Sequence, residues 1–219
     1  MKPITDSPEY KNAVSVEQMR KSDEYTIKNF VKSTELMYRA AMGIYNSCNW
    51  QNKKIAIVTG SGNNAGDGYA LAGILANNNV IPTIIRTTEK FSADGKYYFD
   101  IAKQLGVPDI MFNDNTHLSQ YDIIVDCMLG TGFSGIPKGI IADAINAINC
   151  SGCYVISADI NSGLNGDTGE GVIAVKSDIT VSIGFYKKGM FLGDAPKYIK
   201  ELVNIDIGIV PLPDSIDKN

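Results

Sequence analysis

Short apolar runs recur along the chain after residue 54, and patterns typical of amphipathic helices separate the first several of them. Strands that are apolar throughout, rather than alternately apolar and polar, are typical of a sheet that is buried on both faces. Such strands, separated by helices, predict a parallel sheet with helices on both sides. The predicted strands span residues 55–58, 80–85, 123–125, 154–156, 179–183 and 202–207.

Helical patterns fill the connections between the predicted strands. One helix is expected over Tyr69–Ala76, a second begins after a Ser92 cap and ends at Gly106, and a third spans residues 136–149. The last strands have short links, so they either extend the parallel sheet or end it with antiparallel pairing. The predicted fold class is α/β, a three-layer α/β/α Rossmann-like sandwich with a mostly parallel sheet, in one domain covering residues 1–219.

Two further helices are expected before the first strand. Ser15 and Gln18 match a capping box, in which each residue's side chain bonds the other's backbone N–H, and a helix over residues 16–31 follows. The second prefixed helix spans residues 34–47. Its apolar residues recur at helical spacing and are expected in the core, namely Met37, Ala40, Ala41 and Ile44.

The segment between the first predicted strand and its helix reads Gly-Ser-Gly-Asn-Asn-Ala-Gly-Asp-Gly over residues 60–68. A strand, a glycine-rich turn and a helix present free backbone N–H groups to a phosphate. A plain phosphate loop does not require the amides of Asn63 and Asn64 or the carboxylate of Asp67. The segment is therefore expected to do more than bind phosphate.

The same segment formally fits the dinucleotide fingerprint G-x-G-x-x-G/A, with Ala65 in the last position. That fingerprint also expects an acidic residue at the end of the second strand. The second strand here ends in Arg86, which would instead suit a 2′-phosphate. The match is weak, and it argues against a standard dehydrogenase.

Two more polar loops leave predicted strands. Asp126 ends one strand and opens the glycine-rich stretch 126–135, and Asp159 ends the next strand inside the stretch 157–169. Because the carboxyl ends of parallel strands meet at one edge of a sheet, both aspartates are expected there, beside residues 60–68. The helix predicted from Ile136 would also offer its N-terminus to an anion.

The polar residues at this edge suit a particular kind of cation. Asn64, Asp126 and Ser162 offer hard oxygen ligands with only one formal negative charge. Mg²⁺ and Ca²⁺ favour more carboxylates, so the set fits a monovalent cation better. Zinc is disfavoured because this set of residues contains no nitrogen or sulfur ligands.

Charge and composition exclude several classes of function. The chain has 20 basic and 24 acidic residues without a run of like charges, which argues against nucleic acid or an anionic membrane as partner. No apolar stretch approaches the roughly 18 residues of a membrane span, and residues 1–6 lack a signal-peptide core, so a cytoplasmic protein is expected. His117 is expected in a solvated loop, and structural thiols are expected at Cys48, Cys127, Cys150 and Cys153.

The motifs together, in this order, resemble the YjeF N-terminal domain family, the NAD(P)H-hydrate epimerases. The resemblance rests on residues 16–23, 60–68, 126–132, 157–169 and 187–189, and it spans nearly the whole chain. It implies epimerisation of the R and S forms of hydrated NADH or NADPH (NAD(P)HX) at C6 of the nicotinamide ring, for nicotinamide nucleotide repair. It also implies a separate NAD(P)H-hydrate dehydratase as functional partner, and a homodimer.

The resemblance assigns roles residue by residue. A potassium ion (K⁺) would be held by Asn64, Asp126 and Ser162. Asp159 would face the hydrated ring as the candidate acid/base, with Lys187 as its helper. The substrate would be bound by Asn63, Asn64, Ala65, Gly66, Asp67, Gly130, Thr131, Gly132, Phe133, Ser134, Gly135, Ile136 and Asp159.

Two positions depart from the family pattern. Ala65 stands where glycine is usual, and its methyl group would crowd the loop if φ there were positive. Asn161 stands where proline is common.

A preference between NADHX and NADPHX is left open. The alternative function is a non-catalytic nucleotide-ligand-binding or scaffold module of the same fold. The presence of all four polar site residues argues against this alternative, namely Asn64, Asp126, Asp159 and Ser162.

Overall fold

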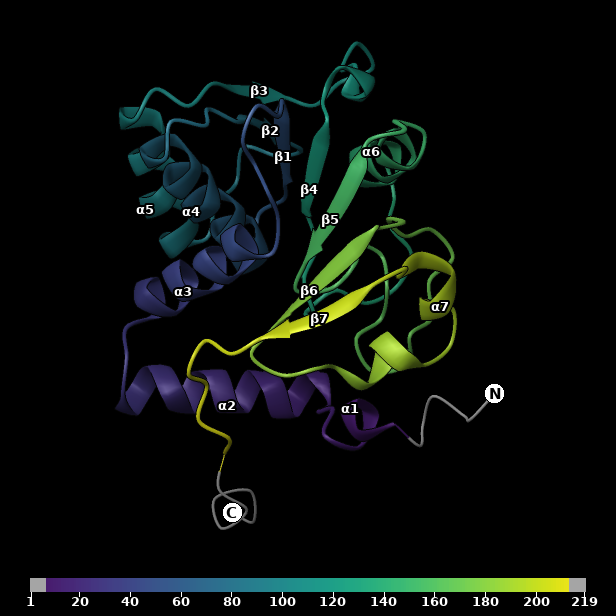
Figure 1. Ribbon diagram of the computed structural model, residues 1–219. Coiled ribbons are helices and arrows are strands. Elements are labelled where there is room, and N and C mark those ends of the chain that lie inside the picture. The colour runs from purple at the N-terminus through teal and green to yellow at the C-terminus, as the bar shows by residue number, and fades with distance from the viewer. Residues whose placement is uncertain (1–6, 213–219) are drawn as a thin grey trace.

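Seven strands form one sheet in the order β3-β2-β1-β4-β5-β6-β7 (Figure 1). The structure is a computed structural model that describes residues 7–212. Every neighbouring pair of strands is parallel. The strands are β1 (Ile55–Thr59), β2 (Thr83–Arg86), β3 (Asp109–Met111), β4 (Ile123–Cys127), β5 (Tyr154–Ala158), β6 (Ile179–Ile183) and β7 (Leu202–Ile205).

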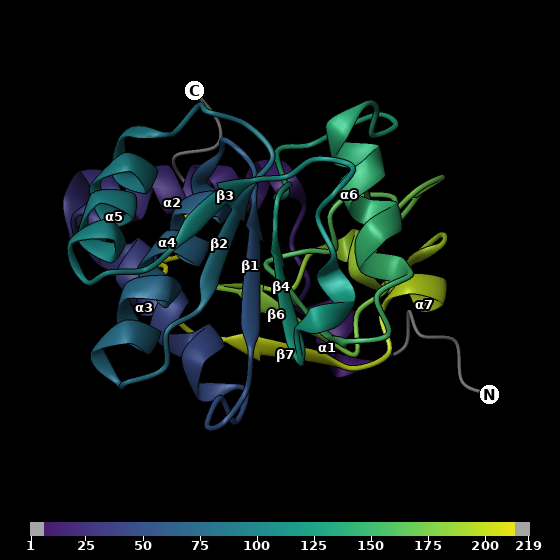
Figure 2. The same cartoon turned by 90° about the horizontal axis from the view of Figure 1, so that it is seen from above.

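Helices cover both faces of this sheet, which confirms the predicted three-layer Rossmann-like sandwich. Figure 2 shows α3, α4 and α5 on one side and α6 on the other. The helices are α1 (Pro8–Lys11), α2 (Val16–Asn29), α3 (Ser33–Asn46), α4 (Asn63–Asn77), α5 (Ala93–Gln104), α6 (Ile140–Asn149) and α7 (Ala195–Tyr198), with 3-10 turns at Leu118–Gln120 and Lys188–Phe191.

The strands are buried on both faces, as their apolar runs predict. In β1, Ile55 and Ile57 pack into the cluster formed with α3, α4 and α5. The intervening Ala56 and Val58 face the other way and pack with α6, where Ile145 is fully buried. Because successive side chains of a strand point to opposite faces, one apolar run supplies both cores.

The prefixed helices are present as α2 and α3, and the Ser15–Gln18 capping box forms at the start of α2. A one-turn helix, α1, also precedes them. Residues distant in the chain hold α2 in place across the carboxyl edge of the sheet (Figure 1). Val16 N donates to Asp167 Oδ1 (2.8 Å), Val210 N to Thr26 Oγ1 (2.9 Å) and Leu212 N to Ser22 Oγ (3.0 Å).

The helix predicted from Ile136 is wrong at its start, because α6 begins at Ile140. Pro137 disfavours helical backbone at the residue before it, and Gly139 has a φ of 54°. Residues 130–139 therefore remain a loop, and no helix N-terminus lies at Ile136 to receive an anion.

The bounds of two predicted strands need correction, and one strand was missed. Strand β2 begins at Thr83 rather than residue 80, since Asn79 has a left-handed φ of 61° and the ladder with β1 starts at Thr83. Strand β7 ends at Ile205 rather than residue 207, and the three-residue edge strand β3 is absent from the prediction. The last strands extend the parallel sheet, which settles the alternative left open by the sequence.

Helix α4 begins at Asn63, so only Gly60–Gly62 of the glycine-rich segment form the turn. Ala65 lies in the first turn of this helix, and its φ is not positive. Its side chain is 1% exposed and packs in the larger core cluster. The methyl group therefore does not crowd a loop there.

None of the helices in residues 7–212 is both long and apolar enough to cross a membrane.

The strand order reverses between β1 and β4, and Gly60 lets the chain pass closely there. A Cβ atom on Gly60 would lie 2.1 Å from the backbone oxygen of Met128, which follows β4. A Cβ on Gly62, two residues later, would meet nothing within 4 Å. Glycine is thus sterically required at position 60 but not at position 62.

We expect Gly60→Ala to lower the free energy of unfolding by about 1–3 kcal/mol, the usual effect of forcing extra atoms into a packed site. Urea unfolding followed by circular dichroism measures the change. Gly62→Ala is the control, because it adds a Cβ where there is room and should cost only the smaller loss of an N-cap glycine. Equal midpoints for the two variants would show that Gly60 is not sterically constrained.

Candidate functional site

A cleft of about 550 Å³ opens at the carboxyl edge of the strands, where the strand order reverses. This is the place where open parallel sheets bind ligands. Helix α2 forms one wall, and the start of α3 lies beside it. The N-terminus of α4 and the loops that follow β4 and β5 contribute the polar side of the cleft.

Asp126 lies beneath the cleft and is completely buried. Its Oδ1 accepts hydrogen bonds from Ser162 Oγ (2.5 Å) and Met128 N (3.3 Å). Its Oδ2 accepts from Ser157 Oγ (3.0 Å) and Ser162 N (2.9 Å). Burial raises the pKa of Asp126, and these four hydrogen bonds oppose that rise. The carboxylate therefore joins the ends of β4 and β5.

Asn64 connects α4 to the same loops. Its Nδ2 donates to Leu129 O (2.9 Å) and Ala158 O (3.1 Å), so the amide is fixed in orientation. Its Oδ1 is buried and has no hydrogen-bond partner among the described residues. Ser162 Oγ lies nearby, since it accepts a hydrogen bond from Leu129 N (2.9 Å). Asn64 and Ser162 therefore both bond Leu129, and Ser162 also bonds Asp126, so the three predicted cation ligands belong to one hydrogen-bond network.

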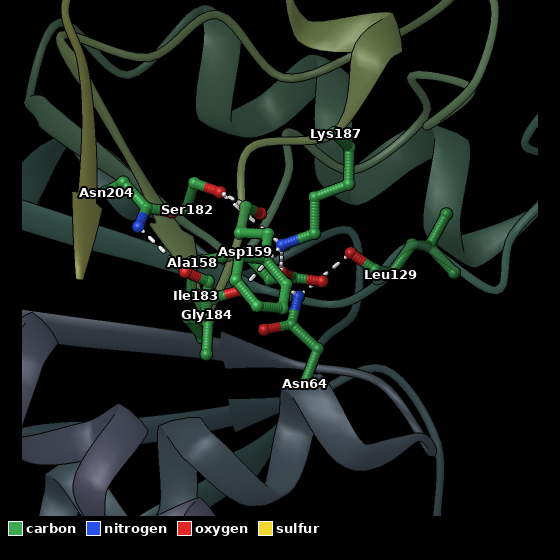
Figure 3. A network of polar contacts seen from close by, with 10 residues as sticks. Asn64, Leu129, Ala158, Asp159, Ser182, Ile183, Gly184, Lys187 and Asn204 are labelled. Carbon is green, nitrogen blue, oxygen red and sulfur yellow. Dashed lines mark hydrogen bonds and ion pairs between the residues drawn. The ribbon is translucent and has the colours of Figure 1, made fainter. Parts of the chain in front are cut away.

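Asp159 and Lys187 form an ion pair at the inner end of the cleft (Figure 3). Lys187 is completely buried, and its Nζ also donates to Ile183 O (2.9 Å) and Ser182 Oγ (3.4 Å). Asp159 keeps 15% of its side chain exposed, on the cleft side. Its φ of 65° is left-handed, a strained conformation that in folded proteins concentrates at functional sites.

Asp23 of α2 and Asp67 of α4 also line the cleft. Burial, and then the carboxylates of Asp159 and Asp23, raise the pKa of Asp67 well above its ordinary range, against the opposing charge of Lys187. Burial and the charge of Asp159 likewise raise the pKa of Asp23. Three carboxylates therefore lie around one buried ammonium group.

The predicted binding residues divide between the cleft and its surroundings. Asn63, Asn64, Asp67, Asp159 and residues 130–133 line the cleft. Ala65 and Gly66 are buried in the first turn of α4, below the lining. Ser134, Gly135 and Ile136 are exposed and do not line the cleft, so their contact with substrate stays a prediction.

The sequence identified residues 16–23 only as part of the family pattern, and the contribution of α2 to the cleft was missed. Val16, Arg20, Asp23 and Ile27 line the cleft at a spacing of one helical face. That spacing was the available signal, but it does not tell whether a stripe faces the core or a cavity.

Asn161, the second departure from the family pattern, is completely buried. Its Nδ2 donates to Val175 O (2.9 Å), Ser177 Oγ (2.9 Å) and Tyr198 O (3.2 Å), and its Oδ1 accepts from Thr180 Oγ1 (2.6 Å). The side chain therefore fixes the loop after β5 by hydrogen bonds.

The cysteines and the histidine lie outside the cleft lining. All four cysteines are free, and Cys127 is buried in the core as expected, whereas Cys150 is exposed. His117 is exposed in a loop, as expected. Within residues 7–212, no three histidine, cysteine, aspartate or glutamate side chains cluster so as to hold a metal ion. A cation at Asn64 would therefore depend mainly on neutral oxygens.

The fold and the cleft define a Rossmann-like α/β protein with a ligand site at the switch point of its sheet. Residues 32–189 match the family model described as YjeF-related protein N-terminus, and the chain belongs to this family.

Several known proteins are similar over most of the chain. It is 36% identical to an NAD(P)H-hydrate epimerase of Oenococcus oeni, over 90% of this chain and 96% of that one. It is also 36% identical to the NAD(P)H-hydrate epimerase of Limosilactobacillus reuteri, over 87% of this chain and 92% of that one. A bifunctional NAD(P)H-hydrate repair enzyme Nnr of Coxiella burnetii is 30% identical, over 88% of this chain and 40% of that enzyme. The solved yeast protein YNL200c superposes with a TM-score of 0.70 at 18% identity, covering 92% and 95% of the two chains, and shares the fold.

Asp67 generates a prediction about stability and pH. Because its pKa is raised in the folded protein, the folded state binds more protons than the unfolded state above the ordinary aspartate range. Its contribution to stability is present at acidic pH and is lost as the pH rises through the folded pKa. We expect Asp67→Asn to raise Tm at pH 7.5 and to leave Tm nearly unchanged near pH 4.

Thermal unfolding across this pH range measures the effect. Asp94→Asn is the control, since Asp94 lines the same cleft from the first turn of α5. A gain in Tm that is equal for both variants, or independent of pH, would refute the charge crowding around Asp67.

Proposed function

We propose that this protein is an NAD(P)H-hydrate epimerase, which interconverts the R and S forms of hydrated NADH and NADPH at C6 of the nicotinamide ring. The observation that carries the proposal is the Asp159–Lys187 pair, which presents one carboxylate to a cleft at the switch point. The relatives named NAD(P)H-hydrate epimerase support the same activity.

The chemistry at C6 requires proton transfer to and from oxygen. The hydrated carbon bears a hydroxyl group and the ring nitrogen, so it is a carbinolamine. When an acid protonates the hydroxyl, the C–O bond breaks, water leaves, and the nitrogen lone pair forms an iminium ion. Water then adds to the opposite face and gives its proton to a base. The atoms balance, and only the configuration changes.

Asp159 is the proposed acid/base at C6. A single positioned acid/base contributes about 10²–10⁴-fold to rate. Lys187 holds one carboxylate oxygen of Asp159, and the other lies 3.6 Å from the position that a Cβ on Gly130 would occupy. Glycine at position 130 therefore leaves space beside the carboxylate for the ring.

The phosphates of the dinucleotide fit the polar mouth of the cleft. The first turn of α4 has no side-chain cap, so its N–H groups are available to an anion. Ser61, Gly62 and Asn63 line the cleft at this turn. Free N–H groups and the helix dipole both favour phosphate there.

A potassium ion is proposed at Asn64, Asp126 and Ser162. The residues fit such an ion, because Asn64 Oδ1 is a buried oxygen without a hydrogen-bond partner. When bound, the ion would supply positive charge beside the buried Asp126 carboxylate. Asn64 and Ser162 would supply neutral oxygens, and both already contact Leu129.

The remaining parts of the proposal concern the setting of the enzyme. A separate NAD(P)H-hydrate dehydratase is its proposed functional partner, and the length of the bifunctional relative, of which this chain matches 40%, is in keeping with a second activity there. A homodimer and a cytoplasmic location stay predictions.

A coupled assay tests the activity. The purified chain is added to the R-hydrate together with an S-specific dehydratase, and consumption of the R-hydrate is followed. We expect acceleration by the wild type and a loss of about 10²–10⁴-fold in kcat for Asp159→Asn. Lys187→Met should also lower kcat, because the carboxylate loses its partner.

Circular dichroism of each variant separates lost catalysis from lost folding, since an unpaired buried charge is strongly destabilising. A full rate for folded Asp159→Asn would refute the acid/base assignment. No acceleration by the wild type would refute the epimerase and favour the non-catalytic binding or scaffold module.

Potassium binding predicts an ion-specific gain in stability. We expect KCl to raise Tm by about 2–4 °C above sodium chloride at equal ionic strength, because a ligand that binds only the folded state stabilises it. Asn64→Leu, which removes the free oxygen, should abolish the difference. Equal Tm values for the wild type in the two salts would refute the site.

A further inference from the structure

Arg86 stands at the end of β2, where dinucleotide-binding folds read the ribose of adenosine. Its Nε and Nη2 donate to Asp109 Oδ2 at 3.2 and 2.9 Å, and its guanidinium lies 5.5 and 5.2 Å from the ring centroids of Phe91 and Phe99. Only 15% of the Arg86 side chain is exposed, and it does not line the cleft. Its charge is therefore already used within the protein.

The cleft itself is poor in positive charge. Its lining carries four carboxylates, those of Asp23, Asp67, Asp94 and Asp159. Among the described residues that line it, Arg20 is the single cationic side chain. A hydrated dinucleotide has a pyrophosphate, and the NADPH form adds a 2′-phosphate. Its phosphates need positive partners, which leaves the N-terminus of α4 and Arg20.

Arg20 is placed to exchange partners. It lies on the cleft-lining face of α2, one turn before Asp23, and 59% of its side chain is exposed. Its Nη1 pairs with Glu24 at 2.6 Å, and Glu24 does not line the cleft. An exposed ion pair of this kind contributes little to stability, whereas a guanidinium binds phosphate through two parallel hydrogen bonds.

We propose that Arg20 binds a phosphate group of the dinucleotide at the mouth of the cleft, and that Arg86 does not take part in recognition. The inference rests on the proposed function, because it names how that substrate is held. The adenosine half then extends along α2 rather than over β2. The phosphate at Arg20 is either the pyrophosphate or the 2′-phosphate, and the two substrates distinguish these sources.

The test measures KM and kcat of Arg20→Gln with NADHX and with NADPHX in the coupled assay. We expect KM to rise roughly 10-fold, the lower end of what a charge-assisted hydrogen bond contributes, with kcat nearly unchanged. An increase in KM with both substrates would identify the pyrophosphate as the group that Arg20 binds. An increase with NADPHX alone would identify the 2′-phosphate. Raising the salt concentration should weaken binding less in the variant than in the wild type.

Lys96→Gln is the matched control, since Lys96 pairs with Asp100 on α5 in the same exposed i,i+4 arrangement away from the cleft. It should leave KM unchanged, and Glu24→Gln, which frees Arg20, should leave KM equal or lower. Unchanged KM values for Arg20→Gln would overturn the inference, as would a changed KM ratio between the substrates in Arg86→Gln.

Binding separates this inference from the proposed function. Calorimetry with adenosine 2′,5′-bisphosphate and with ADP measures phosphate recognition without turnover. We expect at least one of the two to bind the wild type about 10-fold more tightly than Arg20→Gln. An inactive wild type that still shows this difference would refute the epimerase alone. Equal affinities of both proteins for each probe would refute the role of Arg20, whatever the activity.

Discussion

The buried carboxylate of Asp126 is the interaction on which the rest of the site depends. Its four hydrogen bonds join the ends of β4 and β5, and Ser162 extends the connection to Leu129. Leu129 in turn accepts from Asn64 at the start of α4. A buried charge is tolerated only where such partners compensate it. The loops that surround the cleft are therefore positioned by one desolvated group that none of the substrate atoms needs to touch.

Most of the sheet could be predicted because its strands are short apolar runs with polar ends, and β6 was predicted with both ends correct. The errors lie where tertiary contacts decide. The three-residue β3 has no apolar run long enough to recognise, and the backbone restriction imposed by Pro137 overrides the helical pattern predicted from Ile136. The glycines after residue 60 suggested a long loop, but Gly66 and Gly68 lie in α4 and allow close packing. A Cβ on Gly66 would lie 2.4 Å from Met37, and a Cβ on Gly68 would lie 3.0 Å from Cys127 and Ile57.

The site was predictable where the family resemblance assigned a residue or where the sheet edge brought residues together. Asp159 and Lys187 were expected together, and the structure pairs them. The gathering of Asn64 and Ser162 around Leu129 follows from the shared sheet edge. The crowding of Asp23, Asp67 and Asp159 was not predictable, because it depends on where α2 crosses the edge. The partnering of Arg86 by Asp109 also comes from a contact between β2 and the unpredicted β3.

The attachment of α2 to the last described residues has a consequence for the order of assembly. Helix α2 precedes the whole sheet in the chain, but two of the groups that hold it, the backbone N–H groups of Val210 and Leu212, follow the last strand. The sheet from β1 to β5 can form while α2 still lacks these partners. The outer wall of the cleft therefore depends on contacts between residues far apart in the chain, and loss of the bonds from Val210 and Leu212 would loosen α2 and expose the acidic residues of the cleft to water.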